Sequence, residues 1–194
     1  MSHSGFRFLT VGFFVCGFHV AFIATHLPGF VNLCGLPASV GATGLFIIGL
    51  FNVAGTLLAG RLGDHFRKKY LLSLIYLLRA ITFAGLLAAP KTEVTILIFA
   101  GAVGLLWLST VPLTSGLVAQ IFGPQYMSTL FGIVFLSHQI GAFFGAWLGG
   151  VAFDIWGNYD AMWWGSLILG LLGALLNWPI ADTSLRTEVK PVVA

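Results

Sequence analysis

The segment Gly60–Lys69 reads Gly-Arg-Leu-Gly-Asp-His-Phe-Arg-Lys-Lys and separates two long apolar runs. It holds four of the nine basic residues and one of the six acidic residues of the chain. Only 8% of the 194 residues are charged, whereas 58% are hydrophobic. Because such a cluster of charges is too costly to place in hydrocarbon, we predict a water-facing connection between two membrane helices, on the cytoplasmic side.

The composition of the whole chain is typical of a polytopic helical membrane protein. Soluble domains carry about 25% charged residues, far above the fraction found here, and the mean hydropathy of this chain is +0.99. The net charge of +3 comes largely from the connecting segments, so nothing indicates a nucleic-acid partner. The first apolar run is about 20 residues long, which exceeds the h-region of a signal peptide and predicts a retained membrane span.

Six segments are long and apolar enough to cross a hydrocarbon core of about 30 Å, which takes about 20 helical residues. They lie near residues 6–26, 41–60, 70–89, 94–119, 127–152 and 160–181. Turn residues predict the connections at Leu27-Pro28-Gly29, Pro90-Lys91, Gly123-Pro124 and Gly157-Asn158. We therefore predict an all-α integral membrane domain over residues 1–181, followed by a cytoplasmic tail over residues 182–194.

The distribution of basic residues predicts the orientation of these spans. Lys91 lies on the side opposite Gly60–Lys69, and Arg79 falls inside a span. The other seven share the side of that segment: Arg7, Arg61, Arg67, Lys68, Lys69, Arg186 and Lys190. Under the positive-inside rule, this asymmetry predicts that both termini face the cytoplasm of a cell membrane.

An internal repeat links the second and fifth predicted spans. The segment Gly55–Gly60 leads to Asp64, and the segment Gly145–Gly150 leads to Asp154, with glycine, leucine, a small residue, glycine and aspartate matching at an offset of 90 residues. The second span ends inside and the fifth outside, which predicts a 3+3 inverted repeat of the kind found in secondary transporters. The glycines at four-residue spacing along the fifth span also predict a close helix crossing.

The segment Gly60–Lys69 resembles the signature loop of the major facilitator superfamily, which joins the eighth and ninth helices in the second half of these transporters. Arg67 stands where the family has glycine, and His65 stands where it has a basic residue. The matching positions are Gly60, Leu62, Gly63, Asp64, Lys68 and Lys69. From Phe6 to Ala181 the chain is similar to the C-terminal six-helix half of a twelve-helix transporter. The residue pattern of its spans is most similar to that of bacterial monocarboxylate-porter and oxalate/formate-exchanger members.

This resemblance implies a secondary active transporter for a small organic anion such as a monocarboxylate, working by alternating access with proton coupling or exchange. It also implies a gating role for Gly60, Gly63, Asp64, Arg67, Lys68 and Lys69, although a connection that only sets the orientation remains the alternative. Because the resemblance covers one half, three possibilities stay open. The chain is a fragment whose second six-helix half is separate, a homodimeric half-transporter, or a non-transporting membrane protein that binds a partner through the same scaffold.

Ionisable side chains inside the spans are the first candidates for substrate binding or proton coupling, because they are rare and costly in a membrane. His19 and His26 lie seven residues apart on one face of the first span. Arg79 lies near mid-membrane, where it attracts an anion or pairs with neighbouring carbonyl groups. His138 and Gln139 belong to the densest polar cluster of any span, and a histidine can bind an anion or pass a proton near neutral pH.

Uncharged side chains add further candidates on the second and fourth spans. Asn52 lies one helical turn from Thr56, and Trp107 and Thr110 share a face of the fourth span that can line a cavity. Pro112 predicts a bend in that span, because proline frees a backbone carbonyl. Cys16 and Cys34 show neither disulfide nor metal-ligand spacing, and no nucleophile–base pair is visible. We expect no enzyme activity, cofactor or metal.

Overall fold

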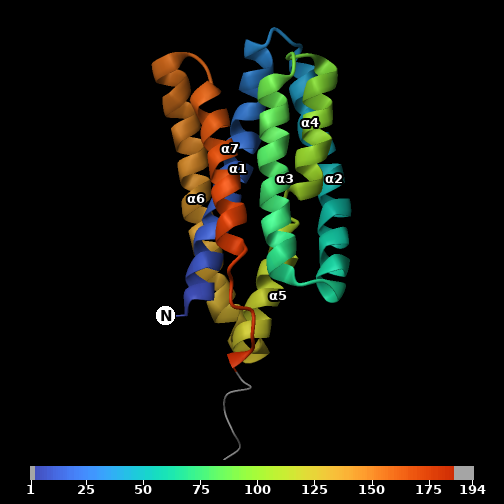
Figure 1. Ribbon diagram of the computed structural model, residues 1–194. Helices are drawn as coiled ribbons and strands as arrows, with labels where there is room; N and C mark the ends of the chain where they lie inside the picture. The colour runs from blue at the N-terminus through green and yellow to red at the C-terminus, as the bar shows by residue number, and fades with distance from the viewer. Residues whose placement is uncertain (1–2, 186–194) are drawn as a thin grey trace, which may run out of the picture.

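The structure is a computed structural model that describes residues 3–185 of the chain (Figure 1). Over these residues it is helical and contains no strand. The elements are α1 (Ser4–Leu33), α2 (Ala38–His65), α3 (Lys68–Ala88), α4 (Glu93–Leu106), α5 (Thr110–Phe122), the 3₁₀ turn η1 (Pro124–Tyr126), α6 (Met127–Trp156) and α7 (Asp160–Asn177). Together they form six stretches long and apolar enough to cross a membrane, with α4 and α5 sharing the fourth. The predicted all-α class with six spans is confirmed.

The turn predicted at Leu27-Pro28-Gly29 is wrong, because α1 continues through it to Leu33 with Pro28 inside the helix. Leu27 and Val31 are completely buried in the continued helix. Their burial offsets the backbone hydrogen bond that a proline removes from a helix interior. The chain reverses later, at Gly35, whose φ of 72° is a conformation that glycine adopts without steric cost.

The fourth span, predicted near residues 94–119 with a bend at Pro112, is interrupted in the structure. Helix α4 ends at Leu106 and α5 begins at Thr110. The interruption precedes Pro112, the residue at which we predicted the bend. Pro112 occupies the first turn of α5, where backbone N–H groups have no partner within the helix, so a residue without an N–H is accommodated there.

The basic segment, Gly60–Lys69, is mostly helical rather than an extended loop. Helix α2 runs through its first part to His65, and α3 begins at Lys68, so only Phe66 and Arg67 connect the two helices. Phe66 has extended backbone angles and ends α2. The connection is therefore two residues long, and the charges of the segment lie on the ends of two helices.

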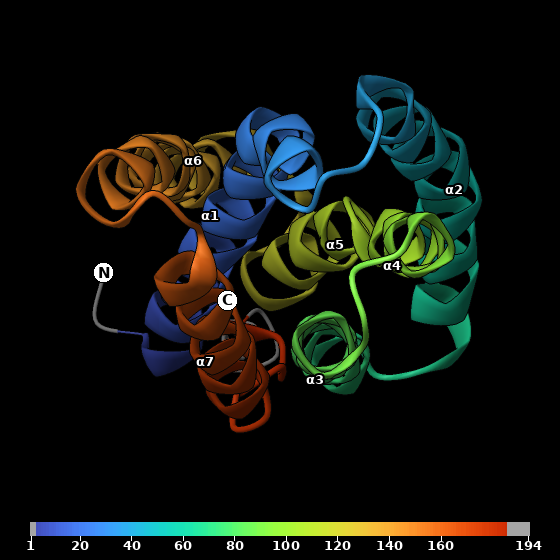
Figure 2. The ribbon, with the colours of Figure 1, turned by 90° about the horizontal axis from the view of Figure 1, so that it is seen from above.

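The six spans pack in three main pairs that reproduce the predicted repeat. The most extensive contacts join α1 to α6, α2 to α4, and α3 to α7. Exchanging the first three spans for the last three converts the α1–α6 pair into the α4–α2 pair and leaves the α3–α7 pair unchanged. Figure 2 shows α6 and α2 at opposite edges of the bundle, with α1 and α5 between them. This exchange symmetry is the one expected of a 3+3 repeat.

Glycines bring the backbones of paired helices together at equivalent places in the two repeats. A Cβ on Gly145 of α6 would lie 2.2 Å from the Phe18 carbonyl oxygen of α1. A Cβ on Gly55 of α2 would lie 1.9 Å from the Leu105 carbonyl oxygen of α4. Neither position has room for a side chain. Close backbone approach of this kind lets dispersion forces hold helices together in an apolar solvent.

The described ends of the chain lie at the same end of the bundle as the basic segment and the α5–α6 connection (Figure 1). The α1–α2, α3–α4 and α6–α7 connections lie at the opposite end. Arg7, near the start of α1, is therefore at the end that carries the basic segment, and Lys91, between α3 and α4, is at the other. Arg186 and Lys190, which we also assigned to the basic end, lie outside the described residues.

Candidate functional site

Arg79 of α3 holds the carbonyl groups that the interruption of the fourth span leaves open. Its Nε donates to the Leu106 oxygen at 3.2 Å, and its Nη2 donates to the oxygens of Leu106, at 2.6 Å, and Trp107. The last carbonyl groups of a helix have no partner within it and carry the negative end of the helix dipole. A buried cation therefore caps the C-terminal end of α4 inside the bundle.

Asn52 of α2 holds the other side of the same interruption. Its Oδ1 accepts a hydrogen bond from the backbone N–H of Leu108 at 3.0 Å and another from the Thr56 hydroxyl at 3.3 Å. Asn52 thus satisfies a backbone donor just before α5 begins, as Arg79 satisfies the acceptors where α4 ends. Two sequence-predicted site residues therefore meet at the interruption, and both bind the backbone rather than an open cavity.

A small polar cluster surrounds the guanidinium group of Arg79. The Cys16 sulfur of α1 lies 3.6 Å from Arg79 Nη2 and 3.2 Å from the Thr110 hydroxyl of α5. Tyr76, one turn before Arg79, places its ring 5.3 Å from the guanidinium carbon and donates its hydroxyl to the Gly12 carbonyl oxygen. Arg79 is 3% exposed, and its Nη1 has no hydrogen-bond partner among the described residues. We call Cys16, Tyr76, Arg79 and Thr110 the polar centre.

His138 and Gln139 lie on α6, beside the polar centre. His138 is buried and stacks on Phe135, and its Nδ1 pairs with the Gln139 side-chain oxygen at 3.0 Å. Its Nε2 is buried without a partner among the described residues. Gln139 is exposed. The His138 backbone carbonyl faces Gly17 of α1, which follows Cys16, because a Cβ on Gly17 would lie 1.9 Å from the His138 oxygen.

His19 and His26 bind the carbonyl groups of two different helices. His19 is 2% exposed, and its Nε2 lies 2.9 Å from the Ser166 oxygen of α7. His26 is half-buried, and its Nε2 lies 2.8 Å from the Ala146 oxygen of α6, next to the ring of Tyr159. Trp107 is half-buried at the interruption itself. The two histidines therefore join α1 to its neighbours and do not converge on one point.

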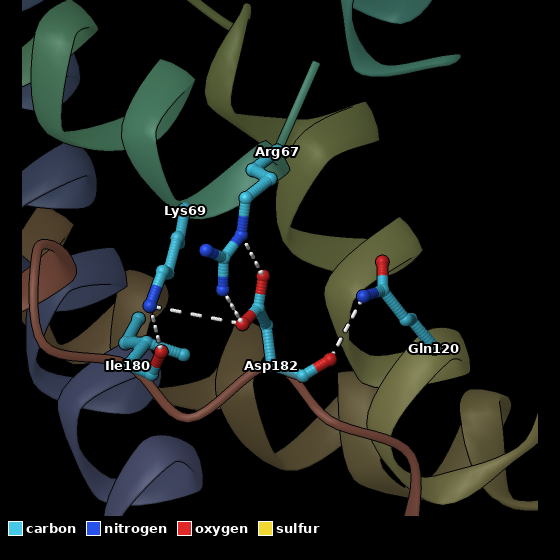
Figure 3. A network of polar contacts seen from close by, with 5 residues as sticks. All are labelled: Arg67, Lys69, Gln120, Ile180 and Asp182. Carbon is cyan, nitrogen blue, oxygen red and sulfur yellow. Dashed lines mark hydrogen bonds and ion pairs between the residues drawn. The ribbon is translucent and has the colours of Figure 1, made fainter. Parts of the chain in front are cut away.

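Two cations of the basic segment, Arg67 and Lys69, converge on Asp182, which follows α7 (Figure 3). Arg67 donates from Nε and Nη2 to the two carboxylate oxygens, and the Lys69 amine lies 3.7 Å from one of them. The same amine donates to the Ile180 oxygen at 2.8 Å, and the Gln120 amide of α5 donates to the Asp182 backbone oxygen at 2.8 Å. Three elements far apart in sequence are thus tied together at this end of the bundle. We call this set of contacts the Asp182 network.

The network places only some of the predicted gating residues in contact. Arg67 and Lys69 bind Asp182, whereas Asp64 is exposed at the end of α2. Gly63 is buried against α5, where a Cβ would lie 2.7 Å from the Leu113 side chain. Gly60 has nothing within 4 Å of the position a Cβ would take. Lys68 is half-buried.

The Asp182 network predicts a pH-dependent contact. Hydrogen bonds from Arg67 lower the pKa of the Asp182 carboxyl, and the charge of Lys69 lowers it further against an opposing effect of burial. A carboxyl whose pKa is lowered by folding stabilises the folded arrangement fully above its ordinary pKa of 3.8. That contribution is lost as the pH falls through the lowered value. A nitroxide on Leu185→Cys should therefore stay immobile from neutral pH to about pH 4 and become mobile below it.

An Asp182→Asn variant should make the same nitroxide mobile throughout this pH range. The matched control is Asp64→Asn, because Asp64 is an exposed carboxylate at the same end of the bundle. If Asp64→Asn released the label as much as Asp182→Asn, general charge rather than the network would hold the segment.

Sequence reasoning missed Cys16, Tyr76 and Asp182 as members of these sites. We interpreted Cys16 as a buried residue without a functional role and placed Asp182 in the tail over residues 182–194. Tyr76 carried a weak signal, since it lies three residues before Arg79 and so shares its helical face. Cys16 and Asp182 carried none, because their partners lie 63 and 115 residues away in the chain.

The fold and the polar centre define the chain as a multi-pass helical membrane protein with the architecture of half a secondary transporter. A comparison with models of known protein families matches residues 9–192 to the Major Facilitator Superfamily, and the chain belongs to this family. A search of curated proteins found no match. Family membership points to a transporter rather than an enzyme. The similarity to monocarboxylate and oxalate/formate carriers, the cell membrane and the orientation stay predictions.

Proposed function

We propose that the chain forms one half of an alternating-access transporter for a small organic anion, such as a monocarboxylate. The observation that carries this proposal is the charge of the bundle interior. The described acidic side chains all lie at helix ends or beyond them: Asp64, Glu93, Asp154, Asp160 and Asp182. Between these ends the spans hold Arg79 and three histidines. An interior with fixed positive charge and no negative charge favours an anionic cargo.

Arg79 selects the sign of the cargo mainly through its field. Its bonds to carbonyl oxygens fix its position without cancelling its charge, since the described residues offer it no carboxylate. Interactions between charges are far stronger in a low-dielectric interior than in water. His138 and Gln139 lie closer to the surface of the bundle and are the groups that contact the cargo, with a proton on His138 as the coupling element.

A second six-helix half completes the site. In α2, and in the Pro124–Trp156 span that contains α6, only 22% of the most apolar stretch is buried within the chain, against 56% in α1. These two helices are repeat equivalents, and they flank α1 and α5 on one side of the bundle (Figure 2). A partner that packs on α2 and α6 leaves α1 and α5 facing a central cavity at the repeat interface, where transporters of this construction bind their cargo.

The test is uptake of a radiolabelled monocarboxylate by proteoliposomes. We expect uptake when the chain is reconstituted with an N-terminal six-helix half of the same family, and none by the chain alone. Uptake by the chain alone, saturable and accompanied by a stable dimer, would replace the separate half by a second copy. No uptake with any second half, while the chain is folded, would overturn the proposal.

A His138→Ala variant should lower that uptake by about tenfold, roughly the effect of losing one well-placed hydrogen bond to a charged cargo. The Nδ1 of His138 pairs with the exposed Gln139 side chain, which water can hydrate once the imidazole is removed. Thr82→Val is the matched control, because the Thr82 hydroxyl bonds only within α3. Equal uptake by the His138 and Thr82 variants would remove His138 from the cargo site.

A further inference from the structure

We infer that a furrow between α2 and α3 binds one phospholipid with an anionic headgroup. The inference requires only that the chain spans a membrane, so it does not depend on the proposed cargo. The furrow exists because α2 and α3 make few contacts with each other, although only two residues connect them.

The inner part of the furrow is an apolar groove of about 250 Å³. Ala59 and Leu62 of α2 form one wall, Leu74 and Ile75 of α3 form the other, and Leu106 and Leu113 lie beneath them at the interruption of the fourth span. Helices α2 and α3, which line the groove, pack mainly on α4 and on α7. In a bilayer, the open side of the groove meets hydrocarbon. An acyl chain is the occupant whose chemistry matches such a lining.

The furrow continues from this groove to the end of the bundle that carries the basic segment. A second hollow of about 380 Å³ shares Leu71 and Leu74 with the groove and adds His65, Arg67 and Tyr70. Tyr70 packs on Trp178 of the neighbouring segment, with ring centroids 4.8 Å apart. Tyrosine and tryptophan gather at the level of the lipid headgroups. The furrow therefore begins at headgroup level and runs into the apolar part of the bundle, as a phospholipid does.

The charge at the outer end of the furrow favours an anionic headgroup. Asp182 supplies one negative charge against two cations, Arg67 and Lys69, so one positive charge of this cluster stays uncompensated. Asp182 holds Nε and Nη2 of Arg67, which leaves Nη1 outside that pair. His65 is exposed beside it and can add a donor. A headgroup whose phosphate is joined to a further anionic or hydroxylated group complements this arrangement better than a zwitterionic headgroup, which carries its own cation.

The test measures lipid retained by the purified full chain with native mass spectrometry. The chain is titrated in detergent with palmitoyl-oleoyl phosphatidylglycerol and, separately, with phosphatidylcholine that carries the same acyl chains. We expect one retained lipid per chain and about fivefold tighter retention of phosphatidylglycerol, the ratio expected for one basic side chain near an anionic lipid. Equal retention of the two lipids would overturn the proposed headgroup site.

Two pairs of variants separate the two parts of the furrow. Leu74→Trp fills the hollow where its parts join and should reduce retention of both lipids, whereas Leu77→Trp, on the same helix and similarly exposed, should not. Arg67→Gln should abolish the preference for phosphatidylglycerol, and Arg7→Gln, an exposed arginine at the same end, should preserve it. Equal effects within either pair would overturn the site, because they would indicate unspecific lipid around the whole bundle.

Discussion

An Arg79→Met variant is expected to melt at a markedly lower temperature than the wild-type chain and to lose uptake in the assembled transporter. Methionine fills similar space but leaves the carbonyl oxygens of Leu106 and Trp107 without their donor. A buried polar group without a partner costs about 1–3 kcal/mol, and in this variant two carbonyl oxygens lose their donor. Thermal melting of the purified chain in detergent, followed by tryptophan fluorescence, measures the loss of stability.

Two further variants identify the cause of that loss. Arg79→Lys keeps the charge but replaces the planar guanidinium by a single ammonium group. Its melting temperature should therefore lie between that of Arg79→Met and that of the wild-type chain. Arg61→Met makes the same change at an exposed position of α2 and should melt as the wild type does. If Arg79→Met also melted as the wild type does, then Arg79 would not hold the interrupted fourth span.

Alanine at Gly55 or at Gly145 is expected to destabilise the bundle to a similar extent. In each case the new methyl group would meet a backbone carbonyl oxygen of the paired helix at about 2 Å, so the two helices must separate. Overpacking of this kind costs about 1–3 kcal/mol even when flexible side chains can adjust, and here the obstacle is backbone. The melting temperature of each purified variant measures the effect.

The repeat also supplies the controls for these substitutions. Gly60 and Gly150 lie five residues further along the same helices, and neither has an atom within 4 Å of its Cβ position. Alanine there should leave the melting temperature unchanged or raise it, because alanine favours a helix over glycine by about 1 kcal/mol. A large loss for Gly145→Ala with none for Gly55→Ala would contradict the equivalence of the two repeats.

Much of this architecture could be predicted from local sequence signals. The low charge and the six apolar runs predicted the spans, because hydropathy over about 20 residues is a local property. The glycines at four-residue spacing along the fifth span predicted a close crossing, since residues four apart share a helical face. The offset between the segments Gly55–Gly60 and Gly145–Gly150 also predicted the repeat that the helix pairs reproduce. The basic segment identified the family, although its helical structure did not follow from its charges.

The interruption of the fourth span could not be predicted in the same way. Pro112 predicted a bend in this span, but the residues from Leu105 to Leu108 continue the apolar run, so no local pattern placed the end of α4 at Leu106. The interruption is stabilised instead by Arg79 and Asn52, which lie 27 and 56 residues from the groups they bind. The Asp182 network is equally non-local. Contacts between side chains and distant backbone atoms depend on the assembled bundle and leave no periodic signal.

The proposed anion selectivity can be measured directly by counterflow. Proteoliposomes that contain the assembled transporter are loaded with an unlabelled monocarboxylate or with an amine of the same size, and entry of a labelled monocarboxylate is followed. Because Arg79 lies in the interior of the bundle and the described acidic side chains lie at helix ends or beyond them, we predict rapid entry with the internal carboxylate and none above background with the amine. Equal exchange with the amine, or entry that persists unchanged in Arg79→Gln, would contradict an anion transporter whose selectivity is set by this arginine.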